Sequence, residues 1–302
     1  MVVVLAFAAN IVVAIAKSIA AVITGSASLL AEAAHSWADA GNEVFLLVAD
    51  RRSQRDSDAS HPLGHGREAY VWALFAAFGV FTIGAVVAVA NGIQELITPE
   101  ATTNYPIAYL VLAVSAVLEG FSLAQSVVQA RRTARGFRRN TLDYVLNGSN
   151  TTLRAVVAED SAALAGLAVA GLAIGLHQLT GEPAYDAVGS IVIGLILAGV
   201  AVLLIDRNRR YLVGLEPPEF IQKQAGRQLL EHPEIERVTY LHLEFIGPSR
   251  LYLVAAVDLT GDAPEDEVAR RLRRLEQQLQ TDELIQVAVL TLSVSDEPSL
   301  EF

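Results

Sequence analysis

One stretch of the sequence carries two residues with the types and spacing of metal ligands. His35 and Asp39 lie four residues apart in an apolar run, residues 29–49, so a helix would place both side chains on one face. An imidazole and a carboxylate together suit a borderline divalent cation such as Zn²⁺. A hydrogen bond between packed helices is the purely structural interpretation of the same pair.

A second apolar run, residues 152–176, carries Glu159 and Asp160. An ionisable side chain inside a membrane span costs about 3 kcal/mol or more, so such residues are candidates for function. A carboxylate from this run could complete a tetrahedral site with His35 and Asp39. We therefore predict a cation site that joins the two runs.

Four other polar residues lie in the same apolar surroundings. Glu32 and Glu43 are expected at water-filled ends of their helix. Asn42 either hydrogen-bonds a neighbouring helix or acts as a further ligand. Lys17 either faces a cavity as a functional charge or extends its ammonium group to a membrane interface.

The polar stretch between the second and third apolar runs holds another candidate site. Asp58, His61 and His65 have spacings typical of metal ligands, and Gly64 and Gly66 let the chain fold back on itself. A solvated polar turn without a metal is the alternative interpretation of this loop.

The composition excludes several classes of chemistry. The 302 residues include no cysteine, so any metal site must use His and carboxylate ligands. No G-x-x-x-x-G-K-[ST] or G-x-S-x-G motif occurs, which argues against ATP-driven pumping and against serine hydrolase chemistry. We expect neither an enzyme nor a prosthetic group. The net charge of −11 argues against a nucleic-acid partner.

Six apolar runs must position these residues. The mean hydropathy is +0.41 and 53% of residues are hydrophobic, and this excess is concentrated in the first two thirds of the chain. A helix of about 20 residues crosses a hydrocarbon core about 30 Å thick. The predicted spans cover residues 2–23, 29–49, 70–97, 107–128, 152–176 and 187–205.

The connections between the runs differ in charge, and this difference predicts the orientation. Three connections contain no Lys or Arg, whereas the other two and the segment after the sixth run are rich in Arg. Because basic loops stay on the cytoplasmic side, we expect a multi-pass protein of the inner or plasma membrane with both termini in the cytoplasm. The basic residues are Arg51, Arg52, Arg55 and Arg67; Arg131, Arg132, Arg135, Arg138 and Arg139; and Arg207, Arg209 and Arg210.

The remainder of the chain is predicted to form an α/β domain. Apolar periodicity indicates a helix over residues 219–231, strands over 238–246 and 250–259, a helix ending near Gln280, and a last strand over 285–294. This α-β-β-α-β order is typical of a small open sandwich. The part has eight basic and 17 acidic residues, so most of the net negative charge lies in it. The division is a six-helix membrane domain, residues 1–212, and a cytoplasmic domain, residues 213–302.

These features together resemble the cation diffusion facilitators. The resemblance rests on residues 31–42 (AEAAHSWADAGN), on the loop 61–68 (HPLGHGRE), and on six spans followed by an α-β-β-α-β domain, so it covers essentially the whole chain. It implies a homodimer with ferredoxin-like cytoplasmic domains. It also implies the export of Zn²⁺ or a related divalent cation by alternating access in exchange for protons. Residues 157–166 are most similar to the branch that includes the divergent mitochondrial zinc transporter of animals.

The same resemblance implies a set of ligands, two from the second span and two from the fifth. His35, Asp39 and Asp160 match three of them, whereas Val156 stands where the family usually has His. Glu159, Asn42 or water would supply the rest, although Glu159 points about 100° away from Asp160 on a regular helix. Fewer imidazoles leave Mn²⁺, Fe²⁺ or Co²⁺ open as the ion, and a transport-inactive regulatory protein open as the function.

The resemblance also extends to the loop and the cytoplasmic domain. Asp58, His61 and His65 match a loop metal site of some family members. The cytoplasmic domain holds only two histidines, His232 and His242, so it lacks most of the family's cytoplasmic metal ligands. We expect this domain to serve dimerisation.

Overall fold

The computed structural model describes residues 2–99, 103–136 and 140–302, and the chain divides into two compact units. The first unit comprises the chain up to Arg51 together with Tyr70–Arg209. The second comprises Arg52–Ala69 and Arg210–Phe302. The loop that carries Asp58, His61 and His65 therefore folds with the C-terminal part of the chain, a grouping that the division at residue 213 does not include.

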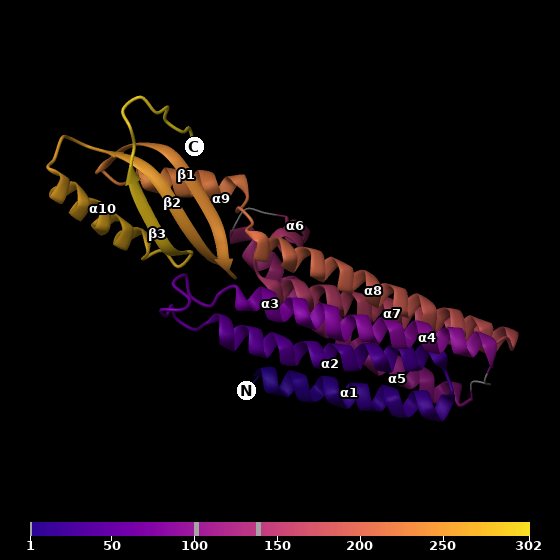
Figure 1. Ribbon diagram of the computed structural model, residues 1–302. Coiled ribbons are helices and arrows are strands. Elements are labelled where there is room, and N and C mark those ends of the chain that lie inside the picture. The colour runs from indigo at the N-terminus through magenta and orange to yellow at the C-terminus, as the bar shows by residue number, and fades with distance from the viewer. Residues whose placement is uncertain (1, 100–102, 137–139) are drawn as a thin grey trace. The chain divides into compact units, whose positions relative to one another are not determined.

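Within the described residues, six long helices build the first unit, and each contains one of the predicted apolar runs (Figure 1). The third is continuous from α3 (Glu68–Phe75) through a π-helical segment, η1 (Ala76–Phe81), into α4 (Thr82–Ile97). The others are α1 (Val2–Thr24), α2 (Ala27–Ser53), α5 (Tyr105–Gly136), α7 (Thr151–Thr180) and α8 (Ala184–Val213). All six share one apolar core, to which they contribute Ala20, Leu29, Ala88, Leu112, Leu167 and Ile193 in chain order.

Four helices in the described part of the chain are long and apolar enough to cross a membrane: Glu68–Ile97, α5, α7 and α8. The helix α2 is not among them because it carries Glu32, Asp39 and Glu43. For α1, the apolar stretch found is the shorter Asn10–Thr24. The assignment of α1 and α2 as spans therefore rests on their packing into the same core as the other four.

The structure adds a short helix, α6 (Thr141–Asn147), in a segment that the hydropathy pattern treats as a connection. Asn150 caps the following helix α7, because its side-chain oxygen accepts from the Leu153 N–H at 3.0 Å. Arg154 is buried at the start of α7 and donates to the Gly148 carbonyl and, at 3.4 Å, to the Val145 carbonyl. This arginine ties the end of α6 to the start of α7.

A carboxylate from α8 caps the N-terminus of α2. Asp186 is buried; its Oδ1 accepts from Ser26 Oγ at 3.0 Å and its Oδ2 from the Ala27 N–H at 2.8 Å. The first N–H groups of a helix lack partners and carry partial positive charge, so a carboxylate there is stabilising. A Cβ at Gly189 of α8 would overlap the Ser28 hydroxyl. These contacts hold the N-terminal ends of α2 and α8 together.

Replacing Asp186 by Ala is expected to lower the free energy of unfolding by about 2 kcal/mol or more, because the first turn of α2 loses a charged acceptor. Thermal unfolding of the detergent-purified protein, followed by tryptophan fluorescence, measures the change. The matched control is Glu182→Ala, at an exposed position just before α8, which is expected to leave the midpoint unchanged. Equal midpoints for the two variants would show that the cap is dispensable.

The C-terminal part of the second unit has the predicted α-β-β-α-β order, and the predicted α/β class is confirmed. Its elements are α9 (Glu219–Leu230), β1 (Ile235–Gly247), β2 (Arg250–Leu259), α10 (Glu265–Leu279) and β3 (Ile285–Leu292). The central strand β2 pairs antiparallel with β1 and parallel with β3. Alternate residues of β2 are buried in one core with Leu229 of α9 and Leu275 of α10. Both helices therefore cover the same face of the sheet.

Candidate metal sites

The face of α2 that the sequence predicts to bind a cation is buried inside the first unit. His35 and Asp39 are 1% and 6% exposed, and His35 Nε2 lies 3.3 Å from Asp39 Oδ1. Among the described residues, neither ring nitrogen of His35 nor Asp39 Oδ1 has a hydrogen-bond partner. In the part of the chain that the structure describes, these three atoms make no hydrogen bond to another helix, so the interpretation of the pair as a hydrogen bond between helices gains no support. Buried polar atoms without partners are rare, and these are the atoms that would ligate an ion.

A buried ion pair joins α1 to α2 one turn before His35. Lys17 Nζ lies 3.0 Å from Glu32 Oε2, and the two side chains are 1% and 0% exposed. The expectation of a water-filled helix end at Glu32 is wrong, and so is the interpretation of Lys17 as a residue that reaches a membrane interface. Their opposite charges satisfy each other inside the bundle. Further along α2, the half-buried Glu43 accepts a hydrogen bond from Asn10 at 2.9 Å.

The adjacent acidic residues of α7 face different helices. Asn42 Nδ2 of α2 donates to Glu159 Oε2 at 2.7 Å, whereas Ser122 Oγ of α5 donates to Asp160 Oδ2 at 2.8 Å. Successive helical residues point about 100° apart, so neighbours in sequence reach two partners. Asn42 therefore makes the interhelical hydrogen bond that was one of its two interpretations. Glu159 therefore reaches α2 from within the continuous helix α7.

The predicted transport ligands are only partly brought together. Among the described residues, the ligand atoms of His35, Asp39 and Asp160 are not all within 4.8 Å of one another. The Glu159 and Asp39 side chains lie within hydrogen-bonding reach of each other. Two carboxylates in contact need a shared proton or a cation between them. The set of His35, Asp39 and Asp160 as ligands stays a prediction. In the structure, Glu159 lies next to Asp39.

A glycine on α7 makes room for the α2 face. A Cβ at Gly166 would overlap Glu32 Oε1 and lie 3.8 Å from His35 Nδ1. Ala162, Ala163 and Ala170 are buried nearby on α7. Small residues let helix backbones approach closely inside a membrane, so α7 closes against α2 beside the candidate ligands.

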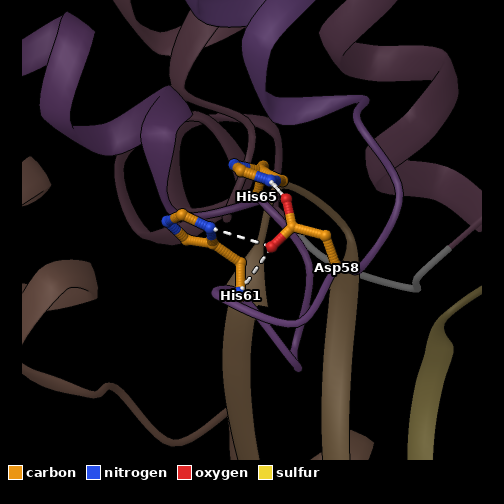
Figure 2. Close-up of side chains that lie close together, drawn as sticks. All are labelled: Asp58, His61 and His65. Atoms are coloured by element: carbon orange, nitrogen blue, oxygen red, sulfur yellow. Dashed lines mark hydrogen bonds and ion pairs between the residues drawn. The ribbon is translucent and has the colours of Figure 1, made fainter.

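The second candidate site lies in the loop between α2 and α3. In the described residues, Asp58, His61 and His65 are the only three His, Cys or acidic side chains with ligand atoms all within 4.8 Å. Asp58 Oδ2 lies 3.0 Å from His65 Nε2, and Asp58 Oδ1 lies 3.3 Å from His61 Nδ1. Figure 2 shows both imidazoles beside the carboxylate; their ring centroids are 4.0 Å apart.

The surroundings of this loop cluster suit a cation. The buried His65 places Nδ1 3.3 Å from Glu68 Oε1, and a carboxylate behind an imidazole fixes the ring for metal binding. Hydrogen bonds from the Ser60 hydroxyl, from His65 and from the His61 backbone hold the pKa of Asp58 well below its usual range. Asp58 is therefore a carboxylate at neutral pH. Two imidazoles and one carboxylate fit Zn²⁺ and leave a fourth position for water.

Comparison with known proteins assigns the family. Residues 3–213 match the cation efflux transmembrane domain. The chain belongs to the cation efflux family. This confirms the resemblance to the cation diffusion facilitators, and a cation efflux protein with these long apolar helices is a multi-pass membrane protein.

Individual relatives of this cation efflux protein are similar over most of its length. It is 34% identical over 248 residues to metal tolerance protein C4 of Arabidopsis thaliana, an alignment covering 82% of this chain and 54% of that protein. It is 32% identical over 247 residues to the human mitochondrial "proton-coupled zinc antiporter SLC30A9", covering 81% and 43%. An uncharacterized transporter of Methanocaldococcus jannaschii is 22% identical over 273 residues, covering 90% and 89%. The chain spans about half the length of the first two relatives.

The loop site of this cation efflux protein is packed against the β1–β2 turn of the same unit. A Cβ at Gly66 would lie 2.5 Å from the Ile246 carbonyl oxygen and 2.9 Å from Gly247 Cα. Arg67 forms an ion pair with Glu244 of β1. The sequence predicts only a turn at Gly66, because a close approach of backbone from a distant strand leaves no local signal in the sequence.

Replacing Gly66 by Val is expected to separate this loop from β1, because the added side chain cannot share space with the Ile246 carbonyl. Limited trypsin digestion should then cut after Arg55 several-fold faster than in the native chain. Ala59→Val adds bulk at an exposed position of the same loop and should leave the rate unchanged. A native cleavage rate in Gly66→Val would contradict the packing described here.

Proposed function

We propose that this protein exports a divalent metal cation, most readily Zn²⁺, in exchange for protons. The observation that carries the proposal is the buried α2 face, where His35 and Asp39 keep ligand atoms without hydrogen-bond partners in the described structure. Asp39 also faces Glu159 of α7, a contact between carboxylates that favours a cation or a proton. The ion is cargo, and no prosthetic group is proposed.

The donor set supports zinc but admits other ions. His35 provides one imidazole, and Asp39, Glu159 and Asp160 provide carboxylates. Imidazole suits Zn²⁺, whereas a surplus of carboxylates also suits Mn²⁺, with Fe²⁺ and Co²⁺ between them. The relatives named for metal tolerance and for proton-coupled zinc antiport support the same assignment.

Proton exchange follows from the chemistry of the ligands. Imidazole and carboxylate each hold either a metal or a proton, so the two compete for one site as it opens to each side in turn. Exporting two charges against about 100 mV, negative inside, costs about 4.6 kcal/mol. Each entering proton returns about 2.3 kcal/mol, plus about 1.4 kcal/mol per pH unit. At a gradient of about one pH unit, two protons leave about 2.8 kcal/mol, a roughly hundredfold metal gradient.

We assign the two parts of the chain different roles. The six-helix part, residues 1–212, is proposed as the transport domain, with both termini in the cytoplasm. The part from residue 213 onward is proposed to mediate homodimerisation and regulation. In the loop, Asp58, His61 and His65 are proposed to hold a second ion that is not transported.

Uptake into proteoliposomes tests the transport proposal. Purified protein, reconstituted with a pH gradient, is offered Zn²⁺, Mn²⁺, Fe²⁺, Co²⁺ and Cd²⁺ singly and in competition, and metal and proton fluxes are read with two dyes. Saturable Zn²⁺ uptake coupled to proton movement is expected. Absence of saturable uptake for every ion would overturn the proposal and favour a transport-inactive regulatory protein, the alternative that Val156 raises.

The loop site predicts a separate stoichiometric change. His65→Ala should remove one bound Zn²⁺ per chain in equilibrium dialysis, because the ion loses one of its three protein ligands. His232→Ala, a histidine of the second unit outside the cluster, is the matched control and should leave the number of bound ions unchanged. The same number of bound ions in His65→Ala would rule out the loop site while leaving the transport proposal intact.

A further inference from the structure

The ion pair between Lys17 and Glu32 places a further carboxylate beside the candidate transport site and balances its charge. Among the described residues, Lys17 Nζ contacts one carboxylate oxygen, Glu32 Oε2, at 3.0 Å. The other oxygen, Glu32 Oε1, is buried and has no hydrogen-bond partner among the residues described. Lys17 therefore balances the charge of this carboxylate, while Oε1 keeps an unused acceptor position.

The available oxygen points to the same place as the candidate metal ligand His35. Glu32 and His35 are three residues apart on α2, so they share one helix face. Glu32 Oε1 and His35 Nδ1 both lie against Gly166 of α7. A Cβ added at Gly166 would overlap Glu32 Oε1 and would lie 3.8 Å from His35 Nδ1. His35 Nδ1 also has no hydrogen-bond partner in the described part of the chain.

We propose that Lys17 is a tethered counter-cation that keeps Glu32 out of the ligand set and so determines which ion the α2 face selects. This inference rests on the proposed function. With Lys17 in place, the ammonium group balances the charge of Glu32, so a divalent cation gains little by contacting Oε1. The ion is then left with one imidazole and the carboxylates around Asp39, a set that favours Zn²⁺ more than the same set with Glu32 added.

Removing either partner should change binding in opposite directions. Without the ammonium group, Glu32 becomes an additional carboxylate ligand, which strengthens binding of harder ions such as Mn²⁺ more than binding of Zn²⁺. Without the carboxylate, an unpaired positive charge remains one helical turn from His35 and repels any divalent cation. A purely structural ion pair would not produce changes of opposite sign.

The test is a four-member cycle of Lys17→Met, Glu32→Gln, the double variant and the native protein. Dissociation constants for Zn²⁺ and Mn²⁺ are measured by calorimetry in detergent, each in a His65→Ala background that removes the loop cluster. Lys17→Met is expected to raise the affinity for Mn²⁺ relative to Zn²⁺ about tenfold. Glu32→Gln is expected to weaken both ions about tenfold, and the double variant to lie within about threefold of the native values.

Three outcomes overturn the inference: an unchanged Mn²⁺ to Zn²⁺ ratio in Lys17→Met, an unchanged affinity in Glu32→Gln, or changes of the same sign in both. If Lys17→Met does not fold, Lys17→Gln keeps a donor for Glu32 without the charge and should shift the ratio in the same direction. An unchanged ratio in that variant also overturns it. Asp39→Asn separates the role of Lys17 from the transport site itself. If metal binding survives Asp39→Asn, the proposed transport site is contradicted. If Asp39→Asn removes metal binding, the transport site stands and the results of the cycle decide the role of Lys17.

Discussion

Replacing Asp39 by Asn is expected to abolish metal transport, with at least about a hundredfold lower uptake. Changes in groups that merely orient a ligand cost about 10–100-fold, so loss of a ligand should cost at least as much. The variant should nevertheless be as stable as the native protein. The amide introduced at this position could donate a hydrogen bond to Glu159, in place of a contact between carboxylates that needs a proton or an ion.

For Asp39→Asn, two measurements on the same preparation separate a loss of transport from a loss of stability. Zinc uptake into proteoliposomes should be lost, while the midpoint of thermal unfolding without added metal should stay the same or rise. Asp50→Asn is the matched control, because Asp50 is an exposed aspartate about three turns further along α2. Native uptake in Asp39→Asn would contradict the assignment of the site, and lost uptake with a lowered midpoint would point to a structural role.

Replacing Gly166 by Ala is expected to have the second largest effect, although the change adds a single methyl group. The new Cβ would overlap Glu32 Oε1, so either the Lys17–Glu32 pair or the α7 backbone must shift. Overpacking of this kind costs about 1–3 kcal/mol. Because Glu32 is buried with no free space on the α7 side, we expect a lower unfolding midpoint and at least about tenfold weaker zinc binding, measured by calorimetry.

The control for this prediction lies on the same helix. At Gly171, an added Cβ would meet no atom within 4 Å. Gly171→Ala should therefore keep native binding and should not lower the midpoint, since Ala favours a helix over Gly by about 1 kcal/mol. If Gly166→Ala behaves like Gly171→Ala, the close contact between α2 and α7 is not needed for the site.

The pair of acidic residues on α7 shows where sequence reasoning ends. The spacing of Glu159 and Asp160 fixes the angle between the side chains, but it does not determine how the helix is rotated in the bundle. That rotation sends Glu159 to Asn42 of α2 and Asp160 to Ser122 of α5. The resemblance to the family favours Asp160 as the ligand, whereas the packing brings Glu159 next to Asp39.

The ion pair between Lys17 and Glu32 is another contact between helices that local sequence patterns do not predict. Lys17 and Glu32 are far from each other in sequence and each has a plausible interpretation as a residue in contact with water. Only the packing of α1 on α2 shows that they neutralise each other. The cap that Asp186 provides for α2 and the contact of Gly66 with β1 are likewise formed by segments distant in the chain.

Features that depend on local spacing are predictable from the sequence. These are the apolar runs, the α-β-β-α-β order, the shared helix face of His35 and Asp39, and the loop spacing of Asp58, His61 and His65. A helix or a short loop is set by residues close together in the chain, so its pattern is visible there. The contacts between side chains of different helices, in contrast, emerge only when the helices are packed together. Those contacts depend on helix rotation and on the position of small residues such as Gly166, which the pattern of any single segment does not encode.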